Sequence, residues 1–159
     1  MTKAFLSKPM GIRPEWIDFN NHLNMAYYGV LFDHGLDEVF DDFGITQDYI
    51  TTRKLTTYAA ELRIRYLREL HLDAKVRVSF QILDMTDKSL HYFSELWHED
   101  GWLSATAEGV SLHIDQSGPR VAPYPSEVHA KIAAMYEAHK DLPRPPSVDT
   151  PMTLRRKKS

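Results

Sequence analysis

Residues 16–28, which read WIDFNNHLNMAYY, place a group of hydrogen-bonding side chains directly before an apolar, helix-like stretch. Four of them follow one another at intervals of two: Asp18, Asn20, His22 and Asn24. The start of a helix offers unpaired backbone N–H groups and the positive end of the helix dipole, and both suit a developing oxyanion. A carboxylate held beside such donors can act as a base for water or as a nucleophile. The spacing therefore indicates acyl-transfer chemistry.

A purely structural explanation of Asp18 stands beside the chemical one. Asp and Asn favour turns and helix starts because their side chains bond to nearby backbone groups. Asp18 alone would be interpreted as a turn or cap residue. The number of polar groups at one regular spacing favours the chemical interpretation.

The element that must position these residues is a helix over residues 25–43. Its apolar residues recur at spacings of three and four, which places them on one face. They are Met25, Tyr28, Phe32, Leu36, Val39, Phe40 and Phe43. Asn24 is the expected N-cap and Gly44 the expected C-terminal stop.

After this helix the apolar period changes from 3.6 to 2, which predicts a meander of four antiparallel strands between residues 52 and 116. The apolar parity changes at Glu108–Gly109, so we expect a β-bulge or bend there. Ser126 is the expected cap of a second helix over residues 126–140. A short strand, a helix, four strands and a helix make an α+β fold.

The chain has 159 residues, of which 43% are apolar and 26% charged, and its net charge is −3. These values predict one domain, residues 1–140, and a proline-rich basic tail, residues 141–159, that is poorly ordered or draped. We expect no nucleic-acid partner, because such domains carry a basic excess. With no cysteine, no signal-like segment and no apolar run of roughly 20 residues, we expect a cytoplasmic protein without membrane association.

Several cofactor and metal motifs are missing from the sequence. There is no Gly-x-Ser-x-Gly elbow, no glycine-rich phosphate loop and no His-x-x-x-His pair on a helix. His91 and His98 are seven residues apart in a strand region, on opposite faces or across a turn. We expect no dedicated metal and no bound cofactor.

The segment from Asp18 to Asn24, with Tyr28 ten positions after the aspartate, resembles the Asp-x-Asn-x-His-x-Asn-Asn-x-x-Tyr signature of hotdog-fold thioesterases of the 4-hydroxybenzoyl-CoA thioesterase-like family. The resemblance extends over about residues 5–116, and residues 61–70 resemble the family's second strand. It implies a hotdog fold, in which an antiparallel sheet wraps around a long central helix, here with an extra C-terminal helix. It also implies hydrolysis of an acyl-CoA substrate.

Carried over by position, the resemblance makes Asp18 the general base or nucleophile. Asn20 and His22 would orient the carboxylate, the water or the thioester, and Asn24 would fix the loop against the helix. The backbone N–H of Met25 would hold the carbonyl oxygen. Met25 stands where many members have a second asparagine, so a side-chain hydrogen bond at this position is lost while the backbone donor is kept.

The remaining site residues also come from the resemblance. Trp16, Tyr27 and Tyr28 are expected to line the substrate pocket, with Glu69 as a second acid. Glu61 is interpreted as a solvated strand residue paired with an arginine. The family places its site at a subunit interface, so we expect a homodimer or a dimer of dimers. An exposed first-strand edge is an aggregation risk that pairing would remove.

The acyl group is a separate question. The chain is rich in aromatic residues, and it is similar as a whole to betainyl-CoA thioesterases of bacterial carnitine breakdown. Aromatic rings can enclose a quaternary ammonium group through cation–π attraction. We therefore expect a short polar or cationic acyl group, with a long acyl chain and a hydroxybenzoyl group as open alternatives. The alternative functions are a non-catalytic hotdog protein that binds acyl thioesters and a hotdog hydratase.

Overall fold

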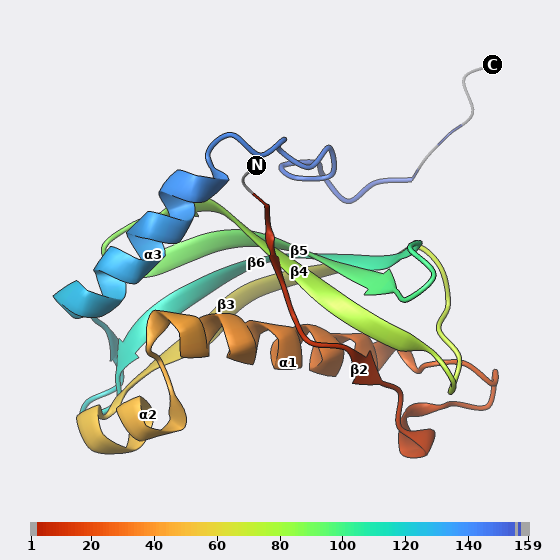
Figure 1. The fold of residues 1–159 in the computed structure, drawn as a ribbon, viewed down its shortest axis with the longest axis horizontal. Helices are drawn as coiled ribbons and strands as arrows, with labels where there is room; N and C mark the ends of the chain where they lie inside the picture. The colour runs from red at the N-terminus through yellow and green to blue at the C-terminus, as the bar shows by residue number, and fades with distance from the viewer. Residues whose placement is uncertain (1–2, 155, 157–159) are drawn as a thin grey trace.

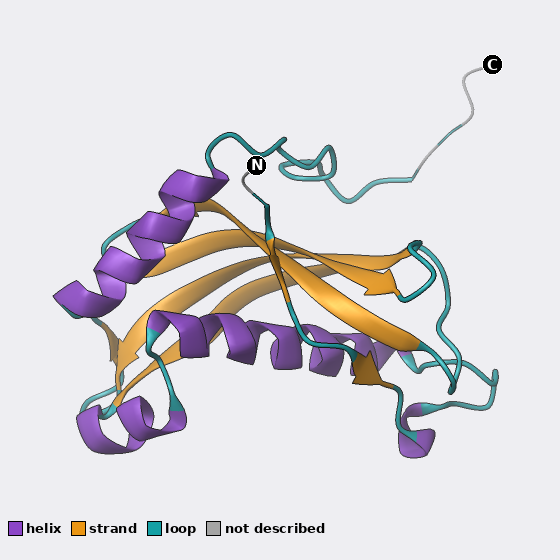
Figure 2. Ribbon diagram, in the orientation of Figure 1, coloured by secondary structure: helices purple, strands orange, loops and turns teal. Residues whose placement is uncertain are grey.

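The computed structural model describes residues 3–154 and 156. One long helix lies along one face of a curved antiparallel sheet (Figures 1 and 2). The elements are β1 (Phe5–Leu6), β2 (Met10–Gly11), η1 (Pro14–Trp16), α1 (Met25–Phe43), α2 (Gln47–Arg53), β3 (Leu55–Tyr66), β4 (Lys75–Met85), β5 (Ser89–His98), β6 (Leu103–Asp115), β7 (Arg120–Val121) and α3 (Ser126–His139). None of the helices in this part of the chain is long and apolar enough to span a bilayer.

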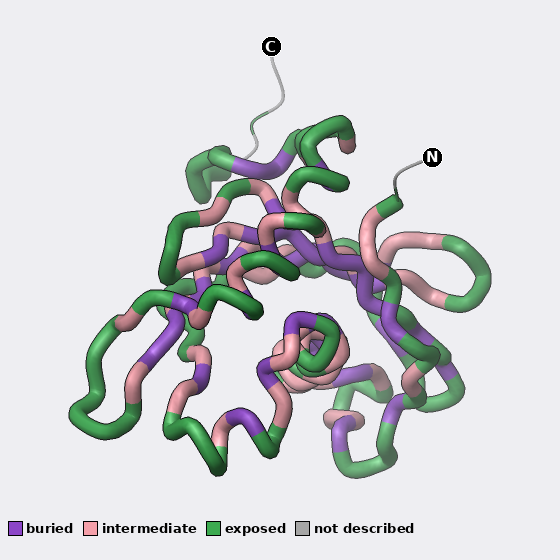
Figure 3. Tube along the Cα trace, turned by 60° about the vertical axis from the view of Figure 1, so that its left-hand side comes forward, coloured by how far each residue is buried: buried purple, intermediate pink, exposed green. Residues whose placement is uncertain are grey.

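The sheet has the order β1-β4-β5-β6-β3, and every pairing in it is antiparallel. β2 also pairs with β4, and β7 with β6. The four long strands are the four that the sequence predicts, and the prediction of a sheet wrapped around a central helix is confirmed. The predicted meander is wrong for the first of them, because β4, β5 and β6 pair in succession while β3 pairs with β6 at the far edge of the sheet. Figure 3 views α1 almost end-on, with the sheet curving over it. β3 lies at the end of this order and, among the residues that the structure describes, pairs only with β6.

α1 begins and ends as the sequence predicts. The Asn24 side chain accepts a hydrogen bond from the Ala26 N–H at 3.0 Å, and Gly44 ends the helix with a φ of 88°. A glycine favours this left-handed conformation because it has no Cβ. The middle of the helix is pressed against β4: a Cβ on Gly35 would lie 2.5 Å from the Val78 Cβ. This close approach fixes the height of α1 under the sheet.

The predicted bulge at Glu108–Gly109 is wrong. β6 passes through Glu108–Gly109 without a register shift, and Ser111 and His113 continue its buried face, while Val110 and Leu112 lie off the core. The register shift lies instead in the neighbouring strand β3, between Ala59 and Glu61. The change of apolar parity did not mark a bulge, because the buried positions in this part of β6 are occupied by polar residues.

His113 can occupy the core because both its ring nitrogens have partners. Nδ1 lies 2.8 Å from the Ala122 carbonyl oxygen, and Nε2 lies 2.8 Å from the Tyr49 hydroxyl. A neutral imidazole that donates through Nδ1 and accepts through Nε2 satisfies both contacts. Tyr49 belongs to α2, a seven-residue helix that the sequence did not predict and whose first residue follows the capping side chain of Thr46.

α3 packs against β4 and ends one residue before the predicted boundary. The predicted cap is wrong, because Pro125 occupies the N-cap position and Ser126 is the first helical residue. Near the other end, the His139 Nδ1 accepts a hydrogen bond from the Ile82 N–H at 3.0 Å. α3 therefore satisfies a backbone donor at the edge of β4.

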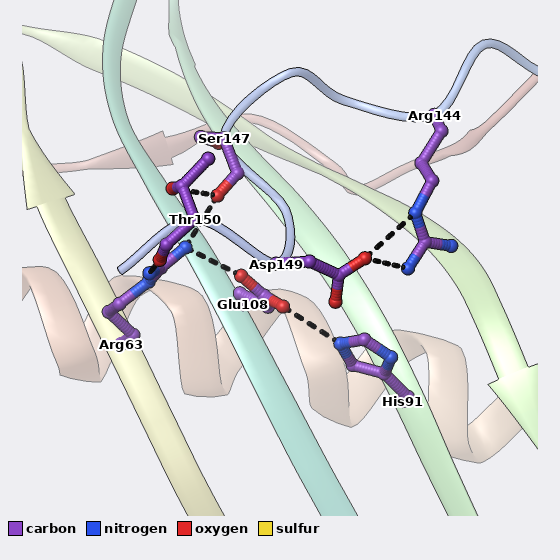
Figure 4. A network of polar contacts seen from close by, with 7 residues as sticks. All are labelled: Arg63, His91, Glu108, Arg144, Ser147, Asp149 and Thr150. Atoms are coloured by element: carbon purple, nitrogen blue, oxygen red, sulfur yellow. Dashed lines mark hydrogen bonds and ion pairs between the residues drawn. The ribbon is translucent and has the colours of Figure 1, made fainter. Parts of the chain in front are cut away.

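The segment after α3 crosses the sheet face opposite α1 (Figure 1). Figure 4 shows how it is held: Arg63 of β3 donates to the carbonyl oxygens of Ser147 and Thr150, and it pairs with Glu108 at 2.8 Å. Within the segment, Arg144 pairs with Asp149. This part of the predicted tail therefore has defined contacts with the domain.

We expect the stability of the fold to fall in mild acid through His139. Burial lowers the pKa of this imidazole below its ordinary value of 6.5, because only the neutral ring is tolerated there and only the neutral ring can accept from Ile82. A base with a lowered pKa stabilises the fold above its unfolded pKa and loses this contribution as pH falls through the folded value. Melting temperatures between pH 8 and pH 5 should therefore decline.

His139→Gln keeps an acceptor that does not titrate, so its melting temperature should decline less in the same pH range. His129→Gln on the same helix is the matched control. Parallel declines in the wild type and the His139 variant would show that another group is responsible.

Candidate active site

The loop before α1 is a tight turn closed by backbone hydrogen bonds. Ile17 and Leu23 form an antiparallel bridge, and the Asp18 N–H donates to the His22 carbonyl oxygen at 3.2 Å. Asn21 turns the chain with a φ of 61°, a conformation that Asn tolerates better than most residues. The alternating polar residues of the sequence pattern are thus gathered in one turn.

The Asp18 carboxylate is half-buried, and one of its oxygens is fixed. Oδ1 accepts a hydrogen bond from the Asn20 N–H at 2.8 Å, an arrangement typical of Asx turns. The other oxygen, Oδ2, has no hydrogen-bond partner among residues 3–154. The turn therefore gives the carboxylate a defined orientation and keeps one oxygen for a ligand.

In the first turn of α1, the backbone N–H of one residue has no acceptor among the described residues. The Asn24 N–H donates to the Trp16 carbonyl oxygen at 2.9 Å, Ala26 donates to the Asn24 side chain, and Tyr27 donates to the Asn24 carbonyl oxygen at 3.0 Å. The Met25 N–H has no acceptor in the described part of the chain, and the Met25 residue is 66% exposed. It is the donor that could meet an external oxyanion.

Asp18 and Met25 share a groove of about 520 Å³ at the start of α1. The residues that line it are Asp18, Phe19, Asn20, His22, Leu23, Asn24, Met25, Tyr28, Tyr66, Leu67, Arg68 and Glu69. All four polar residues of the sequence pattern are among them, together with Tyr28 and Glu69. One wall is the N-terminal turn and α1, and the other is the end of β3 with the chain that follows it.

Contacts between α1 and the chain after β3 hold the two walls together. The Tyr28 hydroxyl accepts from the Leu70 N–H at 3.3 Å, and the Tyr66 hydroxyl donates to the Met25 carbonyl oxygen at 3.1 Å. The two rings meet edge to face, with centroids 5.0 Å apart. Burial raises the pKa of Tyr28, so its hydroxyl stays protonated at neutral pH.

The structure places Trp16 and Tyr27 outside this groove. Their rings stack on each other at a centroid distance of 5.5 Å, and Arg13 lies over Trp16 at 5.2 Å. Trp16 is buried in the core cluster around the first half of α1, and Tyr27 packs against that cluster. Their contacts support the position of the turn.

Tyr66 and Arg68 are groove residues that sequence reasoning did not select. Arg68 also lies over the Trp102 ring, 4.0 Å from its centroid. Arginines that alternate with apolar residues along a strand fit an exposed sheet face without any binding role, and Arg63 binds within the molecule. Only the pairing of β3 with β6 and the turn after Tyr66 bring Arg68 to the groove.

One group of side chains has metal-binding residue types. His91, Glu108 and Asp149 have ligand atoms within 4.8 Å of one another on the outer sheet face (Figure 4). Glu108 already pairs with Arg63 and with His91 at 2.9 Å, and Asp149 pairs with Arg144. Two guanidinium groups therefore balance the two carboxylates, and the cluster is explained as the attachment of the C-terminal segment.

An antiparallel sheet wrapped around one long helix, with a polar groove at the start of that helix, defines a hotdog fold. Residues 12–132 match the family model described as the thioesterase-like superfamily. The chain belongs to this superfamily. The prediction of a hotdog-fold acyl-CoA thioesterase is therefore confirmed at the level of the family.

Relatives and solved structures agree with this assignment. The chain is 31% identical to a betainyl-CoA thioesterase from Pseudomonas aeruginosa over 93% of its own length and 94% of that protein. It is 30% identical to an L-carnitine dehydrogenase/betainyl-CoA thioesterase from Rhizobium meliloti, matching 84% of this chain and 27% of that protein. A Staphylococcus aureus protein solved in complex with CoA superposes with a TM-score of 0.89 at 26% identity, and 98% of each chain is covered.

We expect Asn24→Ala to lower the free energy of unfolding by about 1 kcal/mol, because Ala cannot accept from the Ala26 N–H. Asn24→Asp keeps the acceptor and should restore most of the loss. Denaturant unfolding measures the effect. Equal losses in the two variants would mean that the cap does not stabilise α1.

Proposed function

We propose that the protein hydrolyses an acyl-CoA thioester with the Asp18 carboxylate as the group that drives the reaction. The observation that carries this proposal is the shared groove of Asp18 and the unpaired Met25 N–H at the start of α1. A thioester carbonyl in the groove would have its oxygen at the helix N-terminus and its carbon facing the carboxylate. Arg68 at the rim offers a cation for CoA phosphates.

In the base route, Asp18 takes a proton from a water molecule while the water oxygen bonds to the carbonyl carbon. The carbonyl oxygen becomes an anion that accepts from the Met25 N–H. When the C–S bond breaks, the CoA sulfur leaves as a thiolate. One oxyanion donor is typically worth ~3 kcal/mol of barrier, and a general base typically ~10²–10⁴ in rate.

In the nucleophile route, Asp18 itself bonds to the carbonyl carbon and expels the thiolate, and water then cleaves the mixed anhydride. Both routes use the same carboxylate and the same donor, and Asn20 and His22 orient the reacting groups in either case. An acyl adduct on Asp18, detected by mass spectrometry after rapid acid quenching, would assign the nucleophile route; its absence under conditions that trap a control anhydride would assign the base route.

For the substrate we propose a short cationic acyl group, with betainyl-CoA as the first candidate. The support is that two relatives aligning with most of this chain bear the name of betainyl-CoA thioesterase. CoA as the carrier is supported by the Staphylococcus aureus structure, which was solved with CoA.

We further propose that the protein works as a homodimer joined through β3. This strand has 12 residues, pairs only with β6 in the described part of the chain, and carries the exposed side chains of Leu62 and Tyr66. Near its end, Phe19 is 95% exposed and Met25 66% exposed, at the mouth of the groove. An open edge with apolar neighbours is a surface that a second copy can cover.

We expect Asp18→Asn to lower kcat by about 10²–10⁴-fold, because an amide can neither take a proton nor attack the carbonyl. Free-thiol release from betainyl-, acetyl-, hydroxybenzoyl- and palmitoyl-CoA measures the effect, and betainyl-CoA should give the highest kcat/KM. Asp48→Asn on the exposed side of α2 is the control. Retention of near wild-type kcat by Asp18→Asn would remove Asp18 from its role, and no thiol release by the wild type would favour a non-catalytic binding protein.

We expect the wild type to sediment as a dimer and Leu62→Lys to shift it toward monomer, because the charged side chain would be buried at the edge of β3. Val121→Lys on β7 is the matched control, since Val121 is 42% exposed and Leu62 43%. Sedimentation velocity compares the two. A monomeric wild type would contradict the proposed assembly.

A further inference from the structure

A second cavity lies between the later half of α1 and the sheet, away from the Asp18 groove. It has a volume of about 210 Å³ and opens between α1, α2 and the beginning of β3. Its polar walls are Asp33, Asp37, Thr56, Thr57, Tyr92 and Ser111, and its apolar walls include Leu36 and Phe40. Nothing in the mechanism above uses this cavity.

The acids of this cavity belong to a row of like charges. Asp33, Asp37 and Asp41 follow at spacings of four along α1, and like charges at this spacing repel. None of the three forms an ion pair within the described residues. Partial burial, followed by the neighbouring charge of Asp33, raises the pKa of the Asp37 carboxyl. The row destabilises the free protein, and such a feature is often kept because it binds something.

Tyr92 supplies an independent indication of a ligand. The residue is only 2% exposed, lines the cavity, and its hydroxyl has no hydrogen-bond partner in the described part of the chain. The ring end has room only because its cross-strand neighbour is Gly109, where a Cβ would lie 2.4 Å from the hydroxyl. Burial, and then the charge of Asp33, raises the pKa of Tyr92 to about 12. A side chain that is almost wholly buried thus contributes an unpaired hydroxyl to the wall of an acidic cavity.

Carboxylates, aromatic rings and aliphatic walls together are suited to an organic cation. The carboxylates balance its charge, and an aromatic ring in the wall, such as that of Phe40, can attract it through the ring quadrupole. A volume of about 210 Å³ accommodates a compact group such as trimethylammonium.

Within one subunit this cavity is too far from Asp18 to serve a short acyl group. Asp33 lies eight residues after Met25, which corresponds to about 12 Å along the helix axis. In a betainyl thioester the ammonium nitrogen is separated from the carbonyl carbon by a single methylene. The cation and the reacting carbonyl must therefore be held by different subunits, or the cavity has no part in the reaction.

The geometry of β3 makes the arrangement between subunits possible. The acidic cavity is lined by Thr56, Thr57 and Ala59 at the beginning of the strand, and the Asp18 groove by its last residue, Tyr66. Antiparallel pairing of two β3 edges about a two-fold axis puts the beginning of one strand beside the end of the other.

We infer that Asp33, Asp37 and Tyr92 of one subunit form the cation-binding part of the site whose reacting carboxylate is Asp18 of the other subunit. This inference rests on the proposed function and names the feature of the substrate that the site selects. Each dimer then has two composite sites.

The first test compares two substrates that differ only in charge. Betainyl-CoA and 3,3-dimethylbutyryl-CoA carry a trimethylammonium and a tert-butyl group of nearly the same shape. In the double variant Asp33→Asn/Asp37→Asn, kcat/KM for betainyl-CoA should fall at least about tenfold through KM, while the neutral substrate is turned over at least as well as by the wild type. Asp42→Asn, an exposed acid outside the cavity, is the control.

Equal effects on the two substrates, or no effect on either, would overturn the inference, and the melting temperature of each variant checks its folding. The outcomes separate the two proposals. An inactive Asp18→Asn with unchanged charge discrimination in the acid variant overturns this inference alone. A fully active Asp18→Asn overturns the proposed function.

The second test asks which subunit supplies the acids. An Asp18→Asn subunit and an Asp33→Asn/Asp37→Asn subunit are co-expressed with different tags, and the heterodimer is purified. If the site is composite, one of its two sites is entirely wild type, and the heterodimer should show about half of the wild-type betainyl-CoA activity. If both parts lie in one subunit, each site has a defect and the activity stays near that of the parents. That result, or a monomeric protein, would overturn the inference.

Discussion

The main chain of Leu70 joins the two walls of the candidate site, and the geometry of the groove depends on it. Its carbonyl oxygen accepts from the Leu23 N–H at 2.8 Å, and its N–H donates to the Tyr28 hydroxyl at 3.3 Å. Leu70, a single residue in the loop that follows β3, thereby fixes both the turn that carries Asp18 and the first turns of α1. Leu70 is itself fully buried, so water does not compete for these bonds.

The position of α1 also depends on a few contacts. The contact of Gly35 with Val78 sets the helix against β4, and the cap at Asn24 sets where its free donor begins. A shift of α1 along its axis would move the Met25 N–H relative to Asp18. The rigid part of the site is thus the backbone of the Asp18 turn and of the start of α1. The side chains of Asn20 and His22 project from this backbone.

The sequence was most informative where local physical rules decide the structure. The helix Met25–Phe43, with Asn24 and Gly44 at its ends, follows from apolar spacing and from capping preferences. The alternation of the long strands follows from half-buried sheet faces. The family resemblance added the fold and the class of reaction, and the family match confirms both.

The sequence-based predictions were wrong or incomplete where contacts between residues far apart in the chain determine the structure. Apolar parity misplaced the bulge because His113 is buried with both nitrogens satisfied by Tyr49 and Ala122, which the sequence does not place nearby. α2 is too short for its periodicity to be distinctive. Arg68 reaches the groove only through the turn after β3, and the stacking of Trp16 on Tyr27 draws both rings toward the core.

The C-terminal segment on the outer sheet face limits how several copies can assemble. Arg63 bonds to two of its carbonyl oxygens, and Ser147 and Val148 are buried against the domain. Stacking two sheets through these faces would first require the segment to be displaced and the guanidinium to lose its acceptors. Face-to-face contact between two such sheets is therefore coupled to detachment of the C-terminal segment.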